Sequence, residues 1–337
     1  MKRITKLKKP IHFRSWAAIG GYEERRGPLG ECFDFCDMSD KFGQKTWEIA
    51  EAEMGRIALN TSLSKCGLSH SDLELLVAGD LQNQCVASST GLSSFGIPFL
   101  GVYGACSTCT ESIMMLSSFI DSSEDMKIGA ALTTSHNSAA ERQFRTPIEY
   151  GGQRAPTAQW TSTAAGAFIL EGGEGDVMIT EYMPGKIVNG STADGSNMGG
   201  AMAFAAFDSI SSYFEESGED VRNFDYIVTG DLGRVGSDIL RELLAKELPG
   251  AERIHTDCGL MLYDMKNQDA HSGASGCGTS ASVLACYFLP RLADGQIKRI
   301  LFLSTGALMS PSSLLQGESI YGIAPLIRLE SRKADKK

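Results

Sequence analysis

The chain has 337 residues, of which 42% are hydrophobic and 21% charged, and its formal net charge is -10. This length can bury the cores of two packed units, and the composition is that of an ordinary globular protein. The acidic balance argues against nucleic-acid binding, so an anionic ligand needs a local group of basic side chains. Nine cysteines, an odd number spread along the chain, predict reduced thiols in a cytosol-like compartment.

The first ten residues are basic and lack the apolar core of a signal peptide. They could touch an anionic membrane surface, but we expect a solvated, frayed terminus. Apolar runs in the chain fall short of the roughly 20 residues of a membrane-spanning helix. Residues 11–36 predict a strand and a connection. Cys32 and Cys36 have no second pair at metal-ligand spacing, so we predict no metal site there.

The first half alternates between predicted helices and buried strands. In chain order these are a helix at 44–63, a strand at 73–78, a helix to about 120, and strands at 126–134, 166–170 and 177–182. Gly67 is predicted to end the first of these helices. The long irregular stretch between residues 135 and 160 is typical of a functional loop or a partner contact.

The second half repeats this order. It predicts a helix at 200–217, a strand at 226–229, helices at 238–247 and up to about 292, and strands at 299–304 and 321–329. Residues 75–81 resemble residues 226–232, and Cys106 falls on Cys277 at a later offset. This is a two-unit duplication rather than a solenoid. It predicts an α/β fold of two halves, 1–182 and 183–337, with mainly parallel sheets stacked about a pseudo-twofold axis.

Two aspartates, Asp80 and Asp231, recur at equivalent strand ends of the two halves. Two isolated carboxylates do not make a calcium-binding loop. The symmetry therefore favours a structural or interface role for both.

Cys106 follows a turn of small residues and stands at a predicted helix start. Unpaired backbone N–H groups and the positive end of the helix dipole would favour a thiolate there and could hold an oxyanion. These features suit a nucleophile, and the alternative is a small side chain chosen for tight packing. Cys106 and Cys109 also form a C-x-x-C motif, but this motif is weak evidence for a redox role outside a thioredoxin-like unit.

The duplicated halves, Cys106 at a helix start and the small-residue stretches 161–167 and 278–282 resemble the thiolase and ketoacyl synthase superfamily over nearly the whole chain. The blocks 134–138, 270–277 and 304–311 resemble the stage V sporulation protein AD family of endospore formers. The resemblance implies a thiolase-like fold, no cofactor, and a homodimer that pairs strands near Cys106.

Enzymes of the superfamily carry an acyl group on the cysteine, and His with Asn or a second His supports condensation. In the ketoacyl synthase III pattern, these two partners fall on Gly230 and Gly278 of this chain. His271 stands in a His-x-Gly-x-x-Gly motif one residue shorter than that of thiolases. The resemblance therefore implies a non-catalytic protein, with acyl transfer or thioester hydrolysis at Cys106 as the alternative, using His271 or His136.

The sporulation family implies binding of dipicolinic acid, or of its calcium chelate, and help in its uptake into the developing spore. The implied partners are membrane proteins of the same stage V sporulation A operon, and the implied location is peripheral to the inner spore membrane. A small, flat dianion needs donors for two carboxylates and a flat wall for its ring.

We predict ligand binding by residues near the expected cleft, namely Cys106, His136, Arg142, Arg145 and His271. His136 directly follows a predicted strand, on the side where open α/β sheets bind ligands. The alternatives are a histidine that is hydrogen-bonded locally and arginines that face solvent or a partner. Arg154 is a further cation in this part of the sequence.

Overall fold

Strands from both halves of the chain join one mixed sheet in the computed structural model, which describes residues 2–144 and 154–333. Across the sheet the order is β11-β10-β13-β16-β8-β1-β7-β5-β3-β4, and β2 pairs with β1. The bounds are β1 Thr5–Gly20, β2 Phe35–Cys36, β3 Leu76–Gly79, β4 Phe99–Gly101, β5 Ile128–Ser135, β7 Ala164–Gly172, β8 Val177–Met183, β10 Tyr226–Thr229, β11 His255–Asp257, β13 Arg299–Leu303 and β16 Leu326–Ser331.

Two small sheets and a set of helices complete the described residues. The small sheets pair β12 with β6, and β15 with both β14 and β9. Their strands are β6 Trp160–Thr161, β9 Val188–Asn189, β12 Ala274–Ser275, β14 Gly306–Leu308 and β15 Tyr321–Ile323. The α-helices are α1 Tyr22–Arg26, α2 Trp47–Cys66, α3 Val86–Leu92, α4 Thr108–Ser122, α5 Asn137–Phe144, α6 Met198–Ser217, α7 Gly233–Glu247, α8 Ala251–Ile254, α9 Cys258–Leu262, α10 Cys277–Val283, α11 Leu289–Ala293 and α12 Pro311–Leu315.

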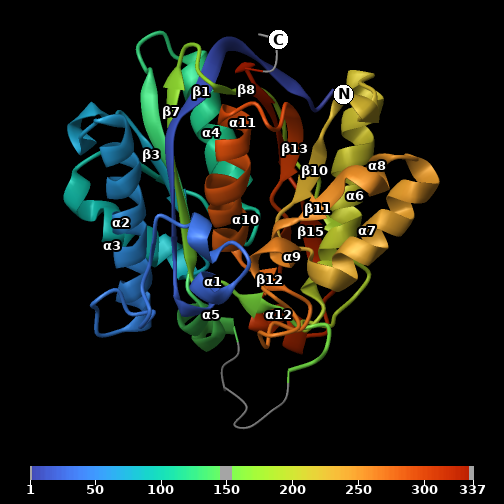
Figure 1. The fold of residues 1–337 in the computed structure, drawn as a ribbon. Coiled ribbons are helices and arrows are strands. Elements are labelled where there is room, and N and C mark those ends of the chain that lie inside the picture. Colours follow the sequence, from blue (N-terminus) through green and yellow to red (C-terminus); the bar gives the residue numbers. More distant parts are fainter. Residues whose placement is uncertain (1, 145–153, 334–337) are drawn as a thin grey trace.

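The duplication is visible in the strand order. The series β1-β7-β5-β3-β4 and β8-β16-β13-β10-β11 run outward from the antiparallel contact between β1 and β8, with matching orientations of their pairs. Helices α4, α10 and α11 lie between the two halves of the sheet, with α2 and α3 on one outer side and α6 and α7 on the other (Figure 1). The predicted α/β fold of two related halves is confirmed.

Two features of the sheet differ from the prediction. The central pairs formed by β1, β7, β8 and β16 are antiparallel, so the sheet is mixed rather than mainly parallel. An apolar strand buried on both faces looks the same in either direction, so its pattern cannot reveal orientation. The strand predicted at 321–329 is divided into β15 and β16, which join different sheets around Pro325. Proline has no N–H to donate to a ladder.

The basic N-terminal segment is not frayed, because β1 already begins at Thr5. The Arg3 guanidinium lies 2.8 Å from the Asp208 carboxylate, and the Arg3 backbone N–H donates to Glu216. These partners lie more than 200 positions away in the sequence, so no local pattern could reveal them. In the ranges 2–144 and 154–333, every helix is too short or too polar to cross a membrane.

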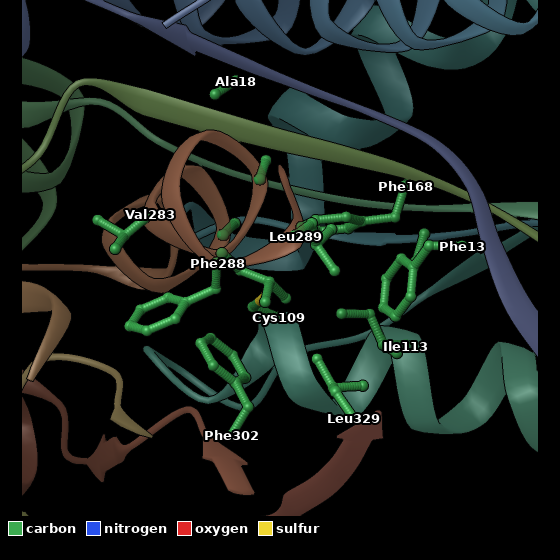
Figure 2. Close-up of a cluster of buried hydrophobic side chains, with 14 of the residues drawn as sticks. Phe13, Ala18, Cys109, Ile113, Phe168, Val283, Phe288, Leu289, Phe302 and Leu329 are labelled. Carbon is green, nitrogen blue, oxygen red and sulfur yellow. The ribbon is translucent and has the colours of Figure 1, made fainter. Parts of the chain in front are cut away.

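The main hydrophobic core fills the space around the central helices (Figure 2). It contains side chains from both halves, including Phe13, Phe168, Phe302 and Leu329, together with Cys109, Ile113, Phe288 and Leu289 of the central helices. Burying each large apolar side chain contributes about 1.5–3 kcal/mol. The two halves therefore share one core, and the Cys106 turn at the start of α4 is held rigidly against it.

Candidate functional site

Cys106 lies in the turn that leads into α4, two residues before the helix begins. The preceding Ala105 has a φ of 51°, a conformation that is uncommon outside glycine. Ser107 donates to the Gly104 carbonyl and to the Glu111 carboxylate, which fixes the turn. The residue is only 6% exposed and packs in a small cluster with Leu81, Ala140 and Cys277.

Asp231, at the end of β10, places a buried carboxylate beside this thiol. It accepts hydrogen bonds from the Ser275 hydroxyl at 3.0 Å, the Gly276 N–H at 2.9 Å and the Thr305 hydroxyl at 2.8 Å. Ser275 also lies 3.9 Å from Cys106 Sγ. Burial raises the pKa of Asp231 to about 6, and the hydrogen bonds oppose that rise.

These surroundings make Cys106 a poor thiolate. Burial, and then the charge of Asp231, raise the pKa of the Cys106 thiol well above its ordinary value. The expectation that the helix start would favour a thiolate is therefore wrong, because a half-charge at the helix end is outweighed by desolvation and a full negative charge. All nine cysteines are free, and burial also raises the pKa of Cys109 to about 12.

The two glycines on which the sequence analysis predicts that catalytic partners would fall, Gly230 and Gly278, are tightly enclosed. A Cβ added to Gly230 would lie 3.0 Å from both Ser304 Cα and Thr305 N. A Cβ on Gly278 would lie 2.2 Å from the carbonyl oxygen of Ala164. Neither position accommodates a larger side chain without movement of backbone.

His136 is 1% exposed and stands immediately before α5, which packs on Cys106 through Ala140. Its Nε2 lies 2.8 Å from the Asp40 carbonyl, and its ring centroid lies 5.3 Å from that of Trp47. The buried Nδ1 has no hydrogen-bond partner. Burial lowers the pKa of His136, so the ring is neutral near pH 7.

The remaining predicted residues lie in other surroundings. His271 Nε2 lies 2.7 Å from the Asp269 carboxylate, and its Nδ1 lies 2.9 Å from the Ala155 carbonyl. Arg142 is exposed and pairs with Glu48 at 3.3 Å. Arg145 lies outside the described residues. The structure thus packs Cys106 against α5. His271 instead contacts Ala155 and Asp269.

Sequence reasoning missed a cavity of about 120 Å³ next to the His271 loop. Its walls come from three distant segments and comprise Glu23, Trp160, Tyr263, Gln268, Asp269 and Ala270. No motif joins these segments, so the only sequence signal was the irregular stretch that ends near Trp160. A larger cavity of about 270 Å³ lies between β1, β8 and β16, and its lining contains none of the predicted site residues.

Comparison with known proteins identifies the family. The family model described as Stage V sporulation protein AD matches residues 1–330. The chain belongs to this family. It is 39% identical to Stage V sporulation protein AD of Bacillus subtilis (strain 168) over 323 residues, which cover 96% of this chain and 95% of that protein. The family name places the protein in sporulation.

Several solved structures share the fold. 3-Oxoacyl-[acyl-carrier-protein] synthase III from Aquifex aeolicus VF5 matches with a TM-score of 0.58 and 13% identity, over 94% of this chain and 99% of its own. The tetronic acid condensing enzyme AbyA1 matches with a TM-score of 0.62 and 14% identity, over 95% and 100%. Cerulenin-bound OleA of Xanthomonas campestris, from a co-crystal, matches with a TM-score of 0.59 and 13% identity, over 95% and 97%. The predicted thiolase-like fold is confirmed, and at this identity the likeness concerns the fold alone.

Proposed function

We propose that this protein is a non-catalytic member of the thiolase-like fold that binds dipicolinic acid, or its calcium chelate, and assists its uptake into the developing spore. The observation that carries the non-catalytic part is the Cys106 site. Its thiol is buried beside the Asp231 carboxylate, and the thiolate form is therefore strongly disfavoured.

The enclosed glycines support the same conclusion. Condensation requires side chains that bind the acyl carbonyl and stabilise developing negative charge. Gly230 and Gly278 supply no such groups, and their surroundings leave no space for them. Asp231 would also repel an enolate or oxyanion that formed next to Cys106. The surroundings of Cys106 are thus unsuited to condensation.

The ligand follows from the family and from the demands of a small, flat dicarboxylate. The neutral ring of His136, with a buried and unpartnered Nδ1, is a polar group near α5 that a protonated or hydrogen-bonding ligand could satisfy. Arg142 and Arg145 extend the same stretch of sequence with positive charge. We assign Cys106, His136, Arg142, Arg145 and His271 to ligand binding as part of this proposal.

We also propose a homodimer that acts peripherally at the inner spore membrane with membrane proteins of the stage V sporulation A operon. The edge strand β4 supports the dimer, because its outer backbone groups lack a strand partner in the sheet. Phe99 and Tyr103 beside this edge are 40% and 47% exposed. A Phe99→Pro variant removes an N–H on the outer edge of β4, because residues 98 and 102 bond to β3. It should shift the sedimentation coefficient to that of a monomer, and an unchanged value would refute pairing through β4.

Calorimetric titration with dipicolinate, with and without calcium, tests the binding function. We expect saturable binding to the wild-type protein and weaker binding to His136→Ala and Cys106→Ala. Failure to bind, together with stoichiometric acylation of Cys106 by an acyl thioester, would overturn the proposal in favour of an acyl-transfer enzyme.

A further inference from the structure

A cavity lies where β1 and β8 separate for a short stretch. The start of β1 passes beside β8 at the upper end of the molecule (Figure 1). Their pairing breaks off after Lys6 and resumes at Ile11, so residues 7–10 of β1 stand opposite the single residue Thr180 of β8. Irregularities of this kind bend a strand and are frequent next to functional sites. The separation leaves a cavity of about 270 Å³.

Thr180 lacks a partner residue in either neighbouring ladder. On the β16 side, Glu181 and Ile179 pair with two consecutive residues, so Thr180 is left over there as well. Its hydroxyl oxygen is buried without a hydrogen-bond partner. A buried hydroxyl without a partner is destabilising, so a ligand that accepts a hydrogen bond from it is bound more tightly.

The backbone of the β1 segment is anchored to the end of α4 instead of to β8. The N–H groups of Lys8 and Lys9 donate to the Asp121 carboxylate at 2.7 and 2.8 Å. Pro10 has no N–H, and its carbonyl accepts a hydrogen bond from Gly173. The segment is thus held away from β8, and the cavity is a fixed feature of the fold.

Cations predominate among the charged side chains of the lining. The cations are Lys8, Lys9 and Arg332, and the one carboxylate of the lining belongs to Glu330. Glu330 is already neutralised by Arg328 Nε at 2.6 Å and Arg299 Nε at 3.1 Å. The cavity therefore has an excess of positive charge on a chain whose net charge is -10, and it attracts anions locally.

The three cations keep capacity for a ligand. Among the described residues, no carboxylate pairs with the Lys8 ammonium. The Lys9 ammonium donates to the Ser123 carbonyl, which uses one of its three N–H groups. Arg332 pairs with Glu174, but both side chains are about half exposed, and exposed pairs contribute little. An anion in the cavity can therefore bind these groups at small cost.

The shape and the remaining lining favour a phosphate ester. Apolar side chains complete the lining, namely Leu7, Pro10, Met178 and Ile179. The volume approaches the roughly 300 Å³ at which ligand pockets begin, which leaves room for an organic part beside a charged group. The donors come from β1, from β8 and from the residue after β16, so they surround the cavity. A tetrahedral phosphate presents oxygens in several directions, whereas a carboxylate presents two in one plane.

We propose that this cavity binds a phosphate ester, either a free small molecule or the headgroup of an anionic lipid. Lys8 and Arg332 bind phosphate oxygens, the Thr180 hydroxyl donates to one of them, and the apolar side chains contact the organic part. The inference goes beyond the proposed function, because the lining contains none of the residues assigned to dipicolinate binding.

Two probes test the proposal and distinguish the two sources of the phosphate group. Glycerol 3-phosphate is titrated into the protein by calorimetry, and vesicles of phosphatidylglycerol are co-sedimented with it, with phosphatidylcholine vesicles as the zwitterionic reference. Saturable binding of glycerol 3-phosphate identifies a soluble ester as the ligand. Binding only to the phosphatidylglycerol vesicles, in excess of the reference, identifies a lipid headgroup. Failure of both probes to bind would refute the proposal.

Three variants locate the binding in the cavity. Lys8→Gln and Arg332→Gln should each weaken binding by about 10-fold, the loss of one charge-assisted hydrogen bond. Thr180→Val, which changes no charge, should weaken binding by about 5-fold. Thr180→Ser keeps the hydroxyl and should bind as the wild type does, which separates loss of the hydroxyl from a folding defect. Unchanged binding by Thr180→Val would show that the attraction comes from diffuse surface charge, and would overturn the site.

The charge-matched control is the double variant Arg222→Gln/Lys246→Gln. Both side chains are highly exposed and pair only with residues next to them or two positions away. This control changes the net charge as much as Lys8→Gln/Arg332→Gln does, and it should bind both probes as the wild type does. An equal loss of binding in the two double variants would contradict a local site.

Competition separates this inference from the proposed function. Saturating dipicolinate should leave the binding of glycerol 3-phosphate or of phosphatidylglycerol vesicles unchanged, because the two sites share no residue. If dipicolinate displaces the probe, the cavity is a dicarboxylate site and this inference fails while the proposed function gains support. If dipicolinate does not bind at all and the probe does, the proposed function fails and this inference stands.

Discussion

The repeat places Asp80 and Asp231 at the same position of the two halves, but the folded protein uses them differently. Asp80 accepts hydrogen bonds from the backbone N–H groups of Gln82 and Ser88 and from the Ser88 hydroxyl, all within its own connection. Asp231 accepts hydrogen bonds from Ser275 and Gly276, at the end of β12, and from Thr305, which follows β13. It also lies beside Cys106 of the first half.

A second buried acid enlarges this difference. Gln82, next to Asp80, donates to the carboxylate of Glu51 on α2, and Thr134 donates to the same carboxylate. Asp231 lies beside the Cys106 thiol. Duplication thus conserves the backbone position of a residue, while the packing of each half decides what its side chain touches.

The difference between the two halves is tested most directly by exchanging equivalent residues at the starts of α4 and α10. Ser107 corresponds to Gly278, and only Ser107 has space for its side chain. Gly278→Ser should reduce the free energy of unfolding by about 3 kcal/mol, because its Cβ would overlap the Ala164 carbonyl. Ser107→Gly should cost about 1 kcal/mol. Urea denaturation measures both, and equal losses would contradict the asymmetry.

The two aspartates should differ in their tolerance of asparagine. Asp80→Asn should cost about 2 kcal/mol, because both carboxylate oxygens accept from backbone N–H groups that cannot turn away from the new amide. Asp231→Asn should cost about 1 kcal/mol, since two of its three donors are hydroxyls that can rotate and accept. Thermal unfolding at pH 7 compares them, and the reverse order would refute this account of the two sites.

Glu51 should make stability depend on pH. Burial, and then Asp80, raise the pKa of Glu51 from its ordinary 4.5 to about 8. The pKa of Glu51 is higher in the folded than in the unfolded protein. The contribution of Glu51 to stability is therefore greatest below about pH 4.5 and falls as the pH rises toward 8. Relative to the wild type, Glu51→Gln should gain about 3 kcal/mol of stability between pH 5 and pH 8, since over most of this range only the unfolded carboxyl is ionised. Denaturation curves at both values measure this, and a pH-independent difference would exclude the effect.

The smallest expected effect concerns thiol reactivity. Removing the negative charge in Asp231→Asn should lower the pKa of Cys106 and speed its alkylation at pH 8 by about 10-fold, since one pKa unit changes the thiolate fraction about tenfold. Cys277 has its own partner, the Thr134 carbonyl, and should react as before. Mass-spectrometric mapping after a short iodoacetamide pulse distinguishes the two cysteines. Equally faster alkylation of Cys106 and Cys277 would indicate that the substitution loosens the packing around both thiols.

The sequence alone determined the architecture to a large extent. The helical spacing over α2, its end at Gly67 and the turn before α4 were correctly predicted from local pattern, and the repeat from the likeness of distant segments. Gly67 has a φ of 70° and ends α2 as a left-handed cap, a conformation that glycine adopts without strain. Such features depend on neighbours within a few residues, so a single chain displays them.

Only the tertiary structure decided the chemistry. The antiparallel contact of β1 with β8, the carboxylate of Asp231 beside Cys106, and the cavity between Glu23, Trp160 and Tyr263 all join segments far apart in sequence. The pKa of a thiol and the shape of a cavity depend on burial and on partners brought together by packing. Local sequence pattern placed Cys106 at a helix start, whereas its desolvation and its neighbour Asp231 decided that it is not a reactive thiolate.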